Sequence, residues 1–526
     1  MSQAVSQAAS PAPPAPLAMT SATRSLLTAC VMAATIMQAL DTTIANVALP
    51  YMQGSLSTTQ DQVNWVLTSY IVAAAIMTSP LGWMAQRFGR KKLFITCAAG
   101  FTLASMLCGA AQSIEQMVAF RLLQGVFGAA LVPVSQAVML DIYPPAQRGA
   151  AMAIWGMGVM LGPIMGPTLG GWLTDHYTWR WVFFVNLPFG VATVLGLSAF
   201  MRETPMRRDI PFAWFGFLSL SLGIGALQMM LDRGQGLGWF DSAEIRVEAV
   251  LAVVGFYFFF ADNATAARPF IPLRMFRDWN FSVAVVFMFV IGIILLATMA
   301  LVTPYLQNLM GYPVLDSGYL LGTRGVGTFF AMMLVGRLSN KVDPRILVGL
   351  GLALATLSLW AMVYWSPETS AMAVAVDSVA QGVGLGLVFV PLNTIAFATL
   401  PSELRADGTA LWTLIRNLGS SIGISLIIAE LTNMFGAFHA QLSEAISPFN
   451  DALRLSAGAG GLSAATDAGR AALDALVTQQ AAILAYANDF LIMTFVSLSA
   501  FPLLLLIRGG KAQARRAQAA HAAAMD

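Results

Sequence analysis

An acidic residue, Asp41, lies inside an early apolar stretch of the chain, LDTTIANVALP (40–50), with apolar turns on both sides. A charged side chain at the bilayer centre costs about 2.5–3.5 kcal/mol on insertion scales, so it is normally kept for function. A carboxyl group in such surroundings is suited to bind and release a proton. Arg121, in another apolar stretch, is its natural partner, because an arginine keeps its own proton. These residues predict proton coupling; a static ion pair, or hydrogen bonds to Thr42 and Thr43, is the structural alternative.

Three more charged residues fall within apolar stretches: Arg324, Asp377 and Arg416. They form a possible second charge site, in which Asp377 binds a cationic substrate or a second proton, or pairs with Arg324. All three histidines lie in loops or a tail, so we expect carboxylates to carry the proton. We expect no metal site, no cofactor and no enzymatic activity, since metal-ligand spacings and a GxxxxGK[ST] phosphate loop are absent from the sequence.

These charges are rare in a chain that is otherwise apolar. Of 526 residues, 57% are hydrophobic and 10% are charged, whereas soluble domains carry roughly 25% charged residues. The composition excludes an ordinary soluble protein and predicts an all-α polytopic membrane protein. The apolar stretches that are long enough to cross a bilayer number fourteen: 25–49, 63–84, 93–111, 116–140, 150–173, 181–200, 211–231, 247–262, 280–306, 315–336, 346–364, 370–396, 408–432 and 486–507.

An even number of transmembrane helices places both termini on one side of the membrane, and the basic residues indicate which side. With cytoplasmic termini, 20 of the 28 basic residues fall in cytoplasmic segments, five in outside segments and three within the spans. Cytoplasmic loops carry an excess of Lys and Arg. We therefore expect a multi-pass protein of the cytoplasmic (inner) membrane, with cytoplasmic tails at 1–23 and 508–526.

The second part of the chain repeats the first. The stretch PYMQ (50–53) recurs 254 residues later as PYLQ (304–307), and QGV (124–126) recurs 257 residues later at 381–383. An ordered series of such matches indicates two related six-helix units.

We call residues 24–202 the first half and residues 279–507 the second half. The two apolar stretches within 203–278 have no counterpart and are predicted to be extra linker helices. Transporters are commonly built from repeated halves, with the substrate site between them near the middle of the membrane. The sequence thus predicts a 6+2+6 arrangement.

Several motifs resemble those of the major facilitator superfamily, specifically its fourteen-helix drug:proton antiporters of the EmrB/QacA kind. They are LDTTIANVALP (40–50), GWMAQRFGRKK (82–92), RLLQGVFGAA (121–130) and GPIMGPTLGG (162–171). Three others are similar to the EmrB branch: WRWVFFVNLPFG (179–190), LDRGQGLGWF (231–240) and SPFN (447–450). The resemblance implies a major-facilitator fold from about residue 25 to 507, with Asp41 coupling protons and Arg121 taking part in proton transfer.

The resemblance also implies a cytoplasmic gating loop, which latches the outward-facing state. Its residues are Gly82, Arg87, Gly89 and Arg90. The family normally has an acid where this chain has Gln86, which weakens a latch based on charge. Asp141 is expected to pair with Arg90 instead.

A glycine-rich motif marks antiporters in the resembled family. Its residues here are Gly162, Gly166, Pro167, Gly170 and Gly171. Glycines at this spacing leave one smooth helix face for a close neighbour, and proline bends the helix. Ordinary helix packing explains the same pattern.

We therefore expect a proton-coupled antiporter that exports hydrophobic drugs or other toxic small molecules by alternating access. A dedicated metabolite exporter or a proton-coupled uptake carrier on the same fold is the alternative, and a membrane enzyme or lipid flippase is a more distant one. Polar and aromatic residues that are candidates for lining the substrate cavity are Gln38, Asn46, Gln124, Trp155, Asn393 and Trp412.

The outside segment 435–485 is long for a loop without a function. In the EmrB branch the permease works with a periplasmic membrane-fusion adaptor and an outer-membrane channel. The resemblance therefore implies a tripartite efflux system, and we expect this segment to help dock the adaptor.

Overall fold

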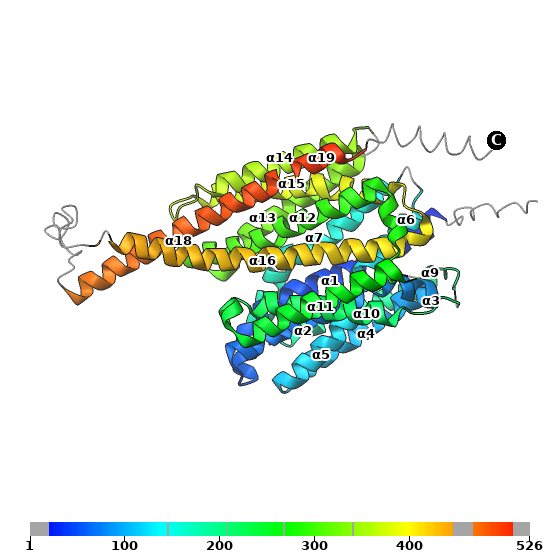
Figure 1. Cartoon of the computed structure of the whole chain (residues 1–526), viewed down its shortest axis with the longest axis horizontal. Coiled ribbons are helices and arrows are strands. Elements are labelled where there is room, and N and C mark those ends of the chain that lie inside the picture. Colours follow the sequence, from blue (N-terminus) through cyan, green and yellow to red (C-terminus); the bar gives the residue numbers. More distant parts are fainter. Residues whose placement is uncertain are drawn as a thin grey trace, which may run out of the picture.

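The computed structural model of the chain is an all-helical bundle with one long projection (Figure 1). The residues that it describes are 20–144, 147–207, 209–266, 269–338, 341–444, 446 and 466–508. Among these residues, eleven helical segments are long and apolar enough to cross a membrane, or twelve if one bent pair counts as a span. The prediction of a multi-pass helical membrane protein is therefore confirmed.

The described residues of the first half form nine helical segments. They are α1 (Ser21–Ser55), α2 (Gln60–Thr78), α3 (Leu81–Phe88), α4 (Arg90–Ala110), α5 (Ile114–Gly128), α6 (Leu131–Ile142), α7 (Arg148–His176), α8 (Trp181–Phe184) and α9 (Asn186–Phe200).

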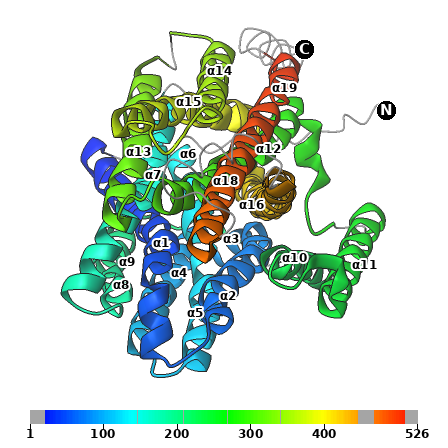
Figure 2. The same cartoon turned by 90° about the vertical axis from the view of Figure 1, so that its left-hand side faces the viewer.

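Two helices follow before the second half, α10 (Trp214–Arg233) and α11 (Ala243–Thr265). They pack against each other, and α10 also contacts α2 and α16. Figure 2 shows the pair at the edge of the bundle, where α11 is the outermost helix. The second half contains α12 (Trp279–Pro304), the π-helical turn η4 (Tyr305–Leu309), α13 (Val314–Leu338), α14 (Pro344–Met362), α15 (Ala371–Ala398), α16 (Arg405–Glu444), α18 (Asp467–Leu498) and α19 (Phe501–Leu506).

Four apolar stretches that we predicted as single helices are each divided into two. The breaks come just before Pro80, Pro133, Pro188 and Pro502, between α2 and α3, α5 and α6, α8 and α9, and α18 and α19. Proline lacks a backbone donor, and its ring collides with the carbonyl four residues earlier, which ends the preceding helix. The break between α2 and α3 bends the path by 58°.

Helix packing follows the repeat. Helix α1 packs on α7 as α12 packs on α16, and α2 packs on α5 as α13 packs on α15. The halves meet mainly where α13 and α15 pack on α7 and where α16 packs on α6 and α3.

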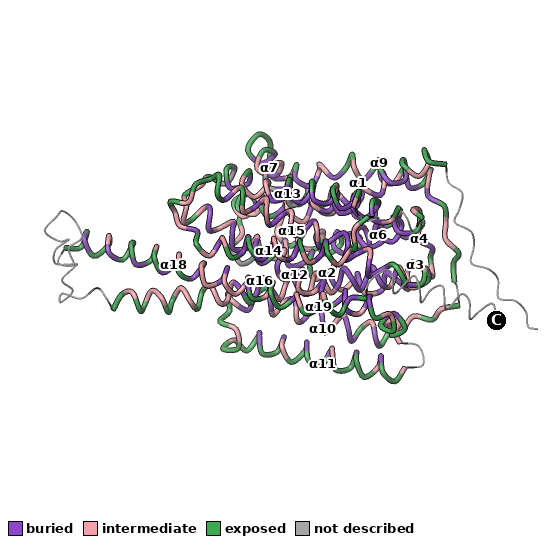
Figure 3. Tube along the Cα trace, turned by 90° about the horizontal axis from the view of Figure 1, so that it is seen from above, coloured by how far each residue is buried: buried purple, intermediate pink, exposed green. Residues whose placement is uncertain are grey.

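The beginning of α1 and the end of α19 lie at one end of the bundle, together with α3, α6 and α9 (Figure 1). We call this the basic end, because Arg90, Arg148 and Arg405 begin helices there. At the opposite end, α16 and α18 extend together beyond the other helices (Figure 3). Most buried residues lie in the central helices, and the projection is largely exposed or partly buried.

Candidate functional site: a buried carboxylate and the latch between the halves

The glycine strip of α7 holds α1 at the level of Asp41. A Cβ atom added to Gly162 would overlap the backbone of Ala39, and one added to Gly166 would overlap the side chain of Thr43. The Thr43 hydroxyl donates a hydrogen bond to the Gly162 carbonyl at 2.9 Å. Close approach of two helices requires such small residues, so this motif fixes the position of α1 on both sides of Asp41.

Two members of the predicted motif, Gly171 and Pro167, are not placed in this contact. An added Cβ at Gly171 would meet nothing within 4 Å, so this glycine lies off the strip. The side chain of Pro167 lies outside the described part of the structure. Gly170 continues the strip, since an added Cβ would press on Ile44.

Asp41 is completely buried and accepts three hydrogen bonds. Its Oδ2 accepts from Nη1 of Arg121 at 2.8 Å, in an ion pair with a 1% exposed guanidinium. Its Oδ1 accepts from Nε2 of Gln124 at 2.8 Å and from Nδ2 of Asn186 at 2.9 Å. Hydrogen bonds to a charged acceptor are the strong ones, so α1, α5 and α9 are joined through one carboxylate.

Gln124 closes a ring with the ion pair, because its Oε1 also accepts from Arg121 at 2.8 Å. The remaining face of the guanidinium is covered: its carbon lies 4.3 Å from the ring centre of Tyr70. Nε of Arg121 donates to the carbonyl of Val66 at 2.9 Å. Arg121 on α5 therefore binds both α1 and α2, and it is buried from solvent.

This arrangement has a direct consequence for proton binding. Protonation of Asp41 would place a donor on a carboxyl group that already accepts three hydrogen bonds, and it would weaken those bonds. It would also cancel the charge that holds Arg121, in a low-dielectric site where such pairs are strongly coupled.

Sequence reasoning missed two members of this network. Asn186 and Ser105 are both fully buried, and Nδ2 of Asn186 also donates to Oγ of Ser105 at 2.9 Å. A signal was present for Asn186, which is a polar residue in the apolar motif WRWVFFVNLPFG. Gln124 was predicted to line the substrate cavity, but it is buried in the Asp41 network instead.

A second cluster joins the two halves at the basic end. Asp141 at the end of α6 forms ion pairs with Arg90 on α4 and with Arg405 on α16. The Arg90–Asp141 contact expected from the sequence is present, and Arg405 adds the connection to the second half. Its Nη1 lies 2.6 Å from Oδ1 of Asp141.

Asp407 supplies a further contact that sequence reasoning missed. Nε2 of Gln86 donates to Oδ2 of Asp407 at 3.0 Å, across the interface between α3 and α16. Gly82 lies directly beneath this carboxylate, and an added Cβ would overlap it. An acid is therefore present at the latch, but it comes from the second half. We call Gln86, Arg90, Asp141, Arg405 and Asp407 the basic-end latch.

The loop between α3 and α4 is built for this position. Gly89 has φ +86°, which favours glycine, and the carboxylate of Glu203 fills the space beside it. That carboxylate accepts hydrogen bonds from the backbone nitrogens of Lys91 and Lys92, at the start of α4. Arg87 is half-buried and lines a surface pocket beside Met206, away from the latch contacts.

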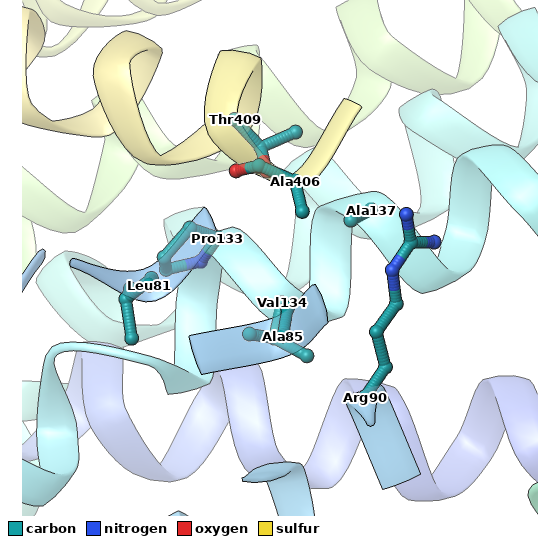
Figure 4. Close-up of a pocket in the computed structure, with 8 residues that line it drawn as sticks. All are labelled: Leu81, Ala85, Arg90, Pro133, Val134, Ala137, Ala406 and Thr409. Atoms are coloured by element: carbon teal, nitrogen blue, oxygen red, sulfur yellow. The ribbon is translucent and has the colours of Figure 1, made fainter. Parts of the chain in front are cut away.

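A small pocket remains inside the latch. Its volume of about 10 Å³ is roughly the space of one water. Figure 4 shows the lining residues, which come from α3, α4 and α6 of the first half and from α16 of the second: Leu81, Ala85, Arg90, Pro133, Val134, Ala137, Ala406 and Thr409. The two halves are therefore in close contact at this end.

Two of the predicted cavity residues belong to the same interface. Asn393 on α15 is 1% exposed and accepts a hydrogen bond from Gln136 on α6. Trp155 on α7 is also 1% exposed and stacks on Phe389, with ring centres 6.0 Å apart. Both residues pack the halves together in this structure.

The other predicted cavity residues differ in their surroundings. Trp412 is buried beside Phe397 in the second half. Gln38 is half-buried and donates to the hydroxyl of Tyr70 at 3.1 Å. Asn46 is exposed. Of the cavity candidates, Gln38 and Asn46 thus keep some access to solvent.

The predicted second charge site is not brought together as one cluster. Asp377 accepts a hydrogen bond from Nε1 of Trp365 at 2.9 Å, and no ion pair joins it to Arg324 among the described residues. Arg324 instead donates to the carbonyl of Leu295 at 3.1 Å. Arg416 donates to Oδ1 of its neighbour Asn417, at 3.3 Å from Nη2.

Asp489 on α18 is an acid that the predicted sites did not include. It is completely buried, and neither carboxyl oxygen has a hydrogen-bond partner among the described residues. A buried polar group without a partner is costly.

The sequence is similar to known proteins over most of its length. The profile of the Major Facilitator Superfamily matches residues 31–424. The chain is 37% identical to the multidrug export protein EmrB of Escherichia coli over 428 residues, which are 81% of this chain and 83% of that protein. It is 35% identical to the fatty acid resistance protein FarB of Neisseria gonorrhoeae over 426 residues, 80% and 83% of the two chains.

Solved structures show the same fold at low sequence identity. The human organic anion transporter MFSD10 matches with a TM-score of 0.57 and 12% identity, over 90% of this chain and 99% of that one. An inward-facing bacterial homologue of the lysosomal transporter Spinster matches with a TM-score of 0.54 and 17% identity, over 93% and 98%. The family profile, the extensive identity and the helical fold agree that this chain is a member of the major facilitator superfamily, of the EmrB type.

Proposed function

We propose that this protein is a proton-coupled antiporter that exports hydrophobic small molecules by alternating access. The observation that carries the proposal is the completely buried carboxylate of Asp41, which accepts from Arg121, Gln124 and Asn186. An ionisable network inside a membrane bundle is expensive and is normally kept for ion or proton movement. Similarity to EmrB, named as a multidrug export protein, supports drugs as the substrates.

In the proposed cycle, Asp41 alternates between a carboxylate bound to Arg121 and a protonated form that releases it. Movement of one proton across about 150 mV supplies roughly 3.5 kcal/mol, at about 2.3 kcal/mol per 100 mV. At 1.4 kcal/mol per tenfold change, this sustains a gradient of a few hundredfold for a neutral substrate. No nucleotide is needed in this scheme.

The basic-end latch would hold the outward-facing state. Its contacts, Gln86 to Asp407 and Asp141 to Arg405, join the halves across the interface. They must break for the site to open toward the basic end. We assign this end to the cytoplasm, since Lys and Arg are in excess in cytoplasmic segments.

We propose fourteen transmembrane helices in a 6+2+6 arrangement, in the inner membrane, with both termini in the cytoplasm. The first half spans residues 24–202, the linker helices lie within 203–278, and the second half spans 279–507. Helix α1 packs on α7 in the first half as α12 packs on α16 in the second, which supports two related halves. The peripheral position of α10 and α11 supports their role as additions between them.

A test uses the protein reconstituted in liposomes with an imposed pH gradient. Asp41→Asn is expected to abolish gradient-driven movement of a neutral fluorescent substrate while leaving binding of that substrate intact. Asp175→Asn is the matched control, because this carboxylate accepts from Tyr51 on the exposed surface. Uphill transport by Asp41→Asn at the parent's rate would show that the coupling acid is elsewhere.

The same liposomes separate export from the alternatives. An exporter moves substrate against the proton flow, whereas a proton-coupled uptake carrier moves both in one direction. A dedicated metabolite exporter would reject chemically varied hydrophobic compounds that a multidrug exporter accepts.

We further propose that segment 435–485 docks a periplasmic adaptor, as part of a tripartite system with an outer-membrane channel. Helix α16 has 40 residues, about 60 Å at 1.5 Å per residue, whereas a bilayer is about 40–45 Å thick with its headgroups. Its last turns and the start of α18 pack together, with His439 3.6 Å from Asp474. The motif SPFN (447–450) lies outside the described residues.

Deletion of 435–485, with a short linker in its place, tests this assignment. Adaptor co-purification is expected to be lost, while gradient-driven transport in liposomes continues. Unchanged co-purification would exclude the projection as the docking site.

A further inference from the structure

The motif LDRGQGLGWF (231–240) begins in the last turn of α10, and its residues belong neither to the proton site nor to the basic-end latch. The segment before α10 is bound at the basic end, where Nε1 of Trp83 on α3 donates to the carbonyl of Ile210 at 3.1 Å. Helix α10 has 20 residues, about 30 Å at 1.5 Å per residue. Its last residues, Leu231, Asp232 and Arg233, therefore lie at the opposite end of the bundle, which we call the outer end.

Asp232 and Arg233 bind α2 of the first half. The carboxylate of Asp232 accepts a hydrogen bond from the hydroxyl of Thr68, which is 4% exposed. The guanidinium carbon of Arg233 lies 5.2 Å from the ring centre of Trp65, and Arg233 also pairs with Glu244 of α11. Two adjacent side chains of α10 thus hold one turn of α2.

The same turn of α2 is attached to the proton site. The carbonyl of Val66 accepts from Nε of Arg121 at 2.9 Å, and the ring of Tyr70, one turn further along, covers the guanidinium. Arg121 on α5 is in turn paired with Asp41 on α1. These contacts join this part of α2 to α1 and α5, so it moves with the first half.

Leu231, the residue before Asp232, binds the second half. Its carbonyl accepts a hydrogen bond from the hydroxyl of Ser425 on α16 at 2.8 Å, and both residues are buried. Helix α16 is itself attached to α12, since the hydroxyl of Ser420 donates to the carbonyl of Gly292 at 2.9 Å. Three consecutive residues at the end of α10 therefore contact both halves.

Helix α10 follows the seam between α2 and α16 toward the middle of the bundle (Figure 2). Ala75 of α2, Leu220 of α10 and Leu414 of α16 belong to one apolar cluster. On α10 and on α16, eleven residues separate this cluster from the outer contact (Leu220 to Leu231, and Leu414 to Ser425), about 16 Å. The two helices therefore run side by side in the same direction along the seam.

We propose that the end of α10 is a tie between the halves, and that Asp232 and Ser425 are positioning residues that stabilise the conformation with a closed basic end. The inference rests on the proposed alternating access, in which the halves move relative to each other. When they move, α10 cannot stay bound to both in its present position, so the opposite conformation keeps one of the two contacts at most. The present conformation has both, and the weaker contact sets how strongly it is favoured.

Such a tie behaves differently from two independent contacts. If the contact with α2 is removed, α10 stays with α16 in both conformations. If the contact with α16 is removed, α10 stays with α2 in both. Either loss therefore shifts the equilibrium by the same amount, and the second loss adds nothing. Independent contacts at separate sites would add their effects.

The test measures spin-label distances between α3 and α16 at the basic end, in the full chain in lipid nanodiscs. Trp65→Leu with Thr68→Val removes the contact with α2 and leaves α10 unchanged, and Ser425→Ala removes the contact with α16. Each variant is expected to raise the ratio of open to closed basic ends about fivefold, as the loss of one neutral hydrogen bond implies. The variant with all three changes is expected to show the same increase.

Two further variants separate the tie from general loosening of the outer end. Thr68→Ser keeps the hydroxyl and is expected to keep the parent's ratio. Asp175→Ala is the matched control, because Asp175 also accepts from a hydroxyl, that of Tyr51 at 2.7 Å, but both residues belong to the first half. It is expected to leave the ratio unchanged.

Three results would overturn the tie. They are an unchanged ratio when either contact is removed, an increase in the combined variant that equals the product of the separate increases, and an equal increase in Asp175→Ala.

These outcomes are distinguishable from failure of the proposed transport function, because the distances are measured without a proton gradient. If the ratios respond as expected but no gradient drives a neutral dye in liposomes, the tie stands and the transport function fails. If a gradient drives the dye but the increases multiply, the transport function stands and the tie is wrong.

Discussion

Asn186 offers the sharpest test of the buried network, because it reaches Asp41 from α9 and is not itself charged. Its Nδ2 donates to Oδ1 of Asp41 at 2.9 Å, with both side chains completely buried. Asn186→Leu removes this donor and keeps a side chain that branches at Cγ. It leaves the donors from Arg121 and Gln124 in place.

The size of the effect follows from the contact. A hydrogen bond to a charged group contributes about 1.5–3 kcal/mol, and about 1.4 kcal/mol corresponds to one pH unit of proton binding. The lost donor stabilised the carboxylate form, so the variant should take up its proton more readily. The midpoint of the pH dependence of transport is expected to move upward by about one to two units.

Gradient-driven dye transport, recorded in liposomes over a series of pH values, measures this midpoint. Ser105→Ala provides a graded control, since it removes a partner of Asn186 but leaves the contact with Asp41. A much smaller shift is expected for it. If Asn186→Leu keeps the parent's midpoint while Asp41→Asn is uncoupled, Asn186 does not tune the proton site and the reasoning is refuted.

Three further outcomes follow from particular contacts. Gly166→Val should collide with Thr43 and destabilise the protein by about 1–3 kcal/mol, as in other overpacked cores, which lowers its melting temperature in detergent. Gly171→Val should be tolerated, because that site is open. Equal melting temperatures for the two variants would contradict the packing of α7 on α1. Asp407→Leu removes the acceptor for Gln86. The population of molecules with an open basic end should then increase several-fold, as measured from spin-label distances between α3 and α16. An unchanged distance distribution would argue against the latch. Asp489→Leu removes a buried carboxyl without a partner among the described residues. The melting temperature should therefore stay unchanged or rise. A marked fall would mean that this carboxyl has a stabilising partner.

Much of this molecule was accessible from local sequence. Long apolar stretches predict helices because a bilayer satisfies no backbone hydrogen bonds, and the structure has helices at those positions. The repeat predicted which helices would pack in the same way. Pro80, Pro133, Pro188 and Pro502 were visible in the sequence, and each of them ends a helix inside a stretch that periodicity alone treats as continuous.

The glycine-rich motif of α7 (162–171) predicted a smooth helix face, but not its partner. Only the packed structure places that face against Ala39 and Thr43, on both sides of Asp41. The same holds for the ion pair of Arg90 and Asp141, where spacing suggested a contact within the first half. That Arg405 completes it from the second half depends on how the halves meet.

The sequence by itself determined that an acid and an arginine lie inside the membrane-spanning helices, because their cost in an apolar stretch is a local property. Tertiary structure alone decided that Gln124 and Asn186 share the carboxylate of Asp41, since these residues are 83 and 145 positions away from it. It also decided that Arg324 lies opposite a leucine backbone and not beside Asp377. Which buried charges are paired depends on the side chains that neighbouring helices bring to the same depth.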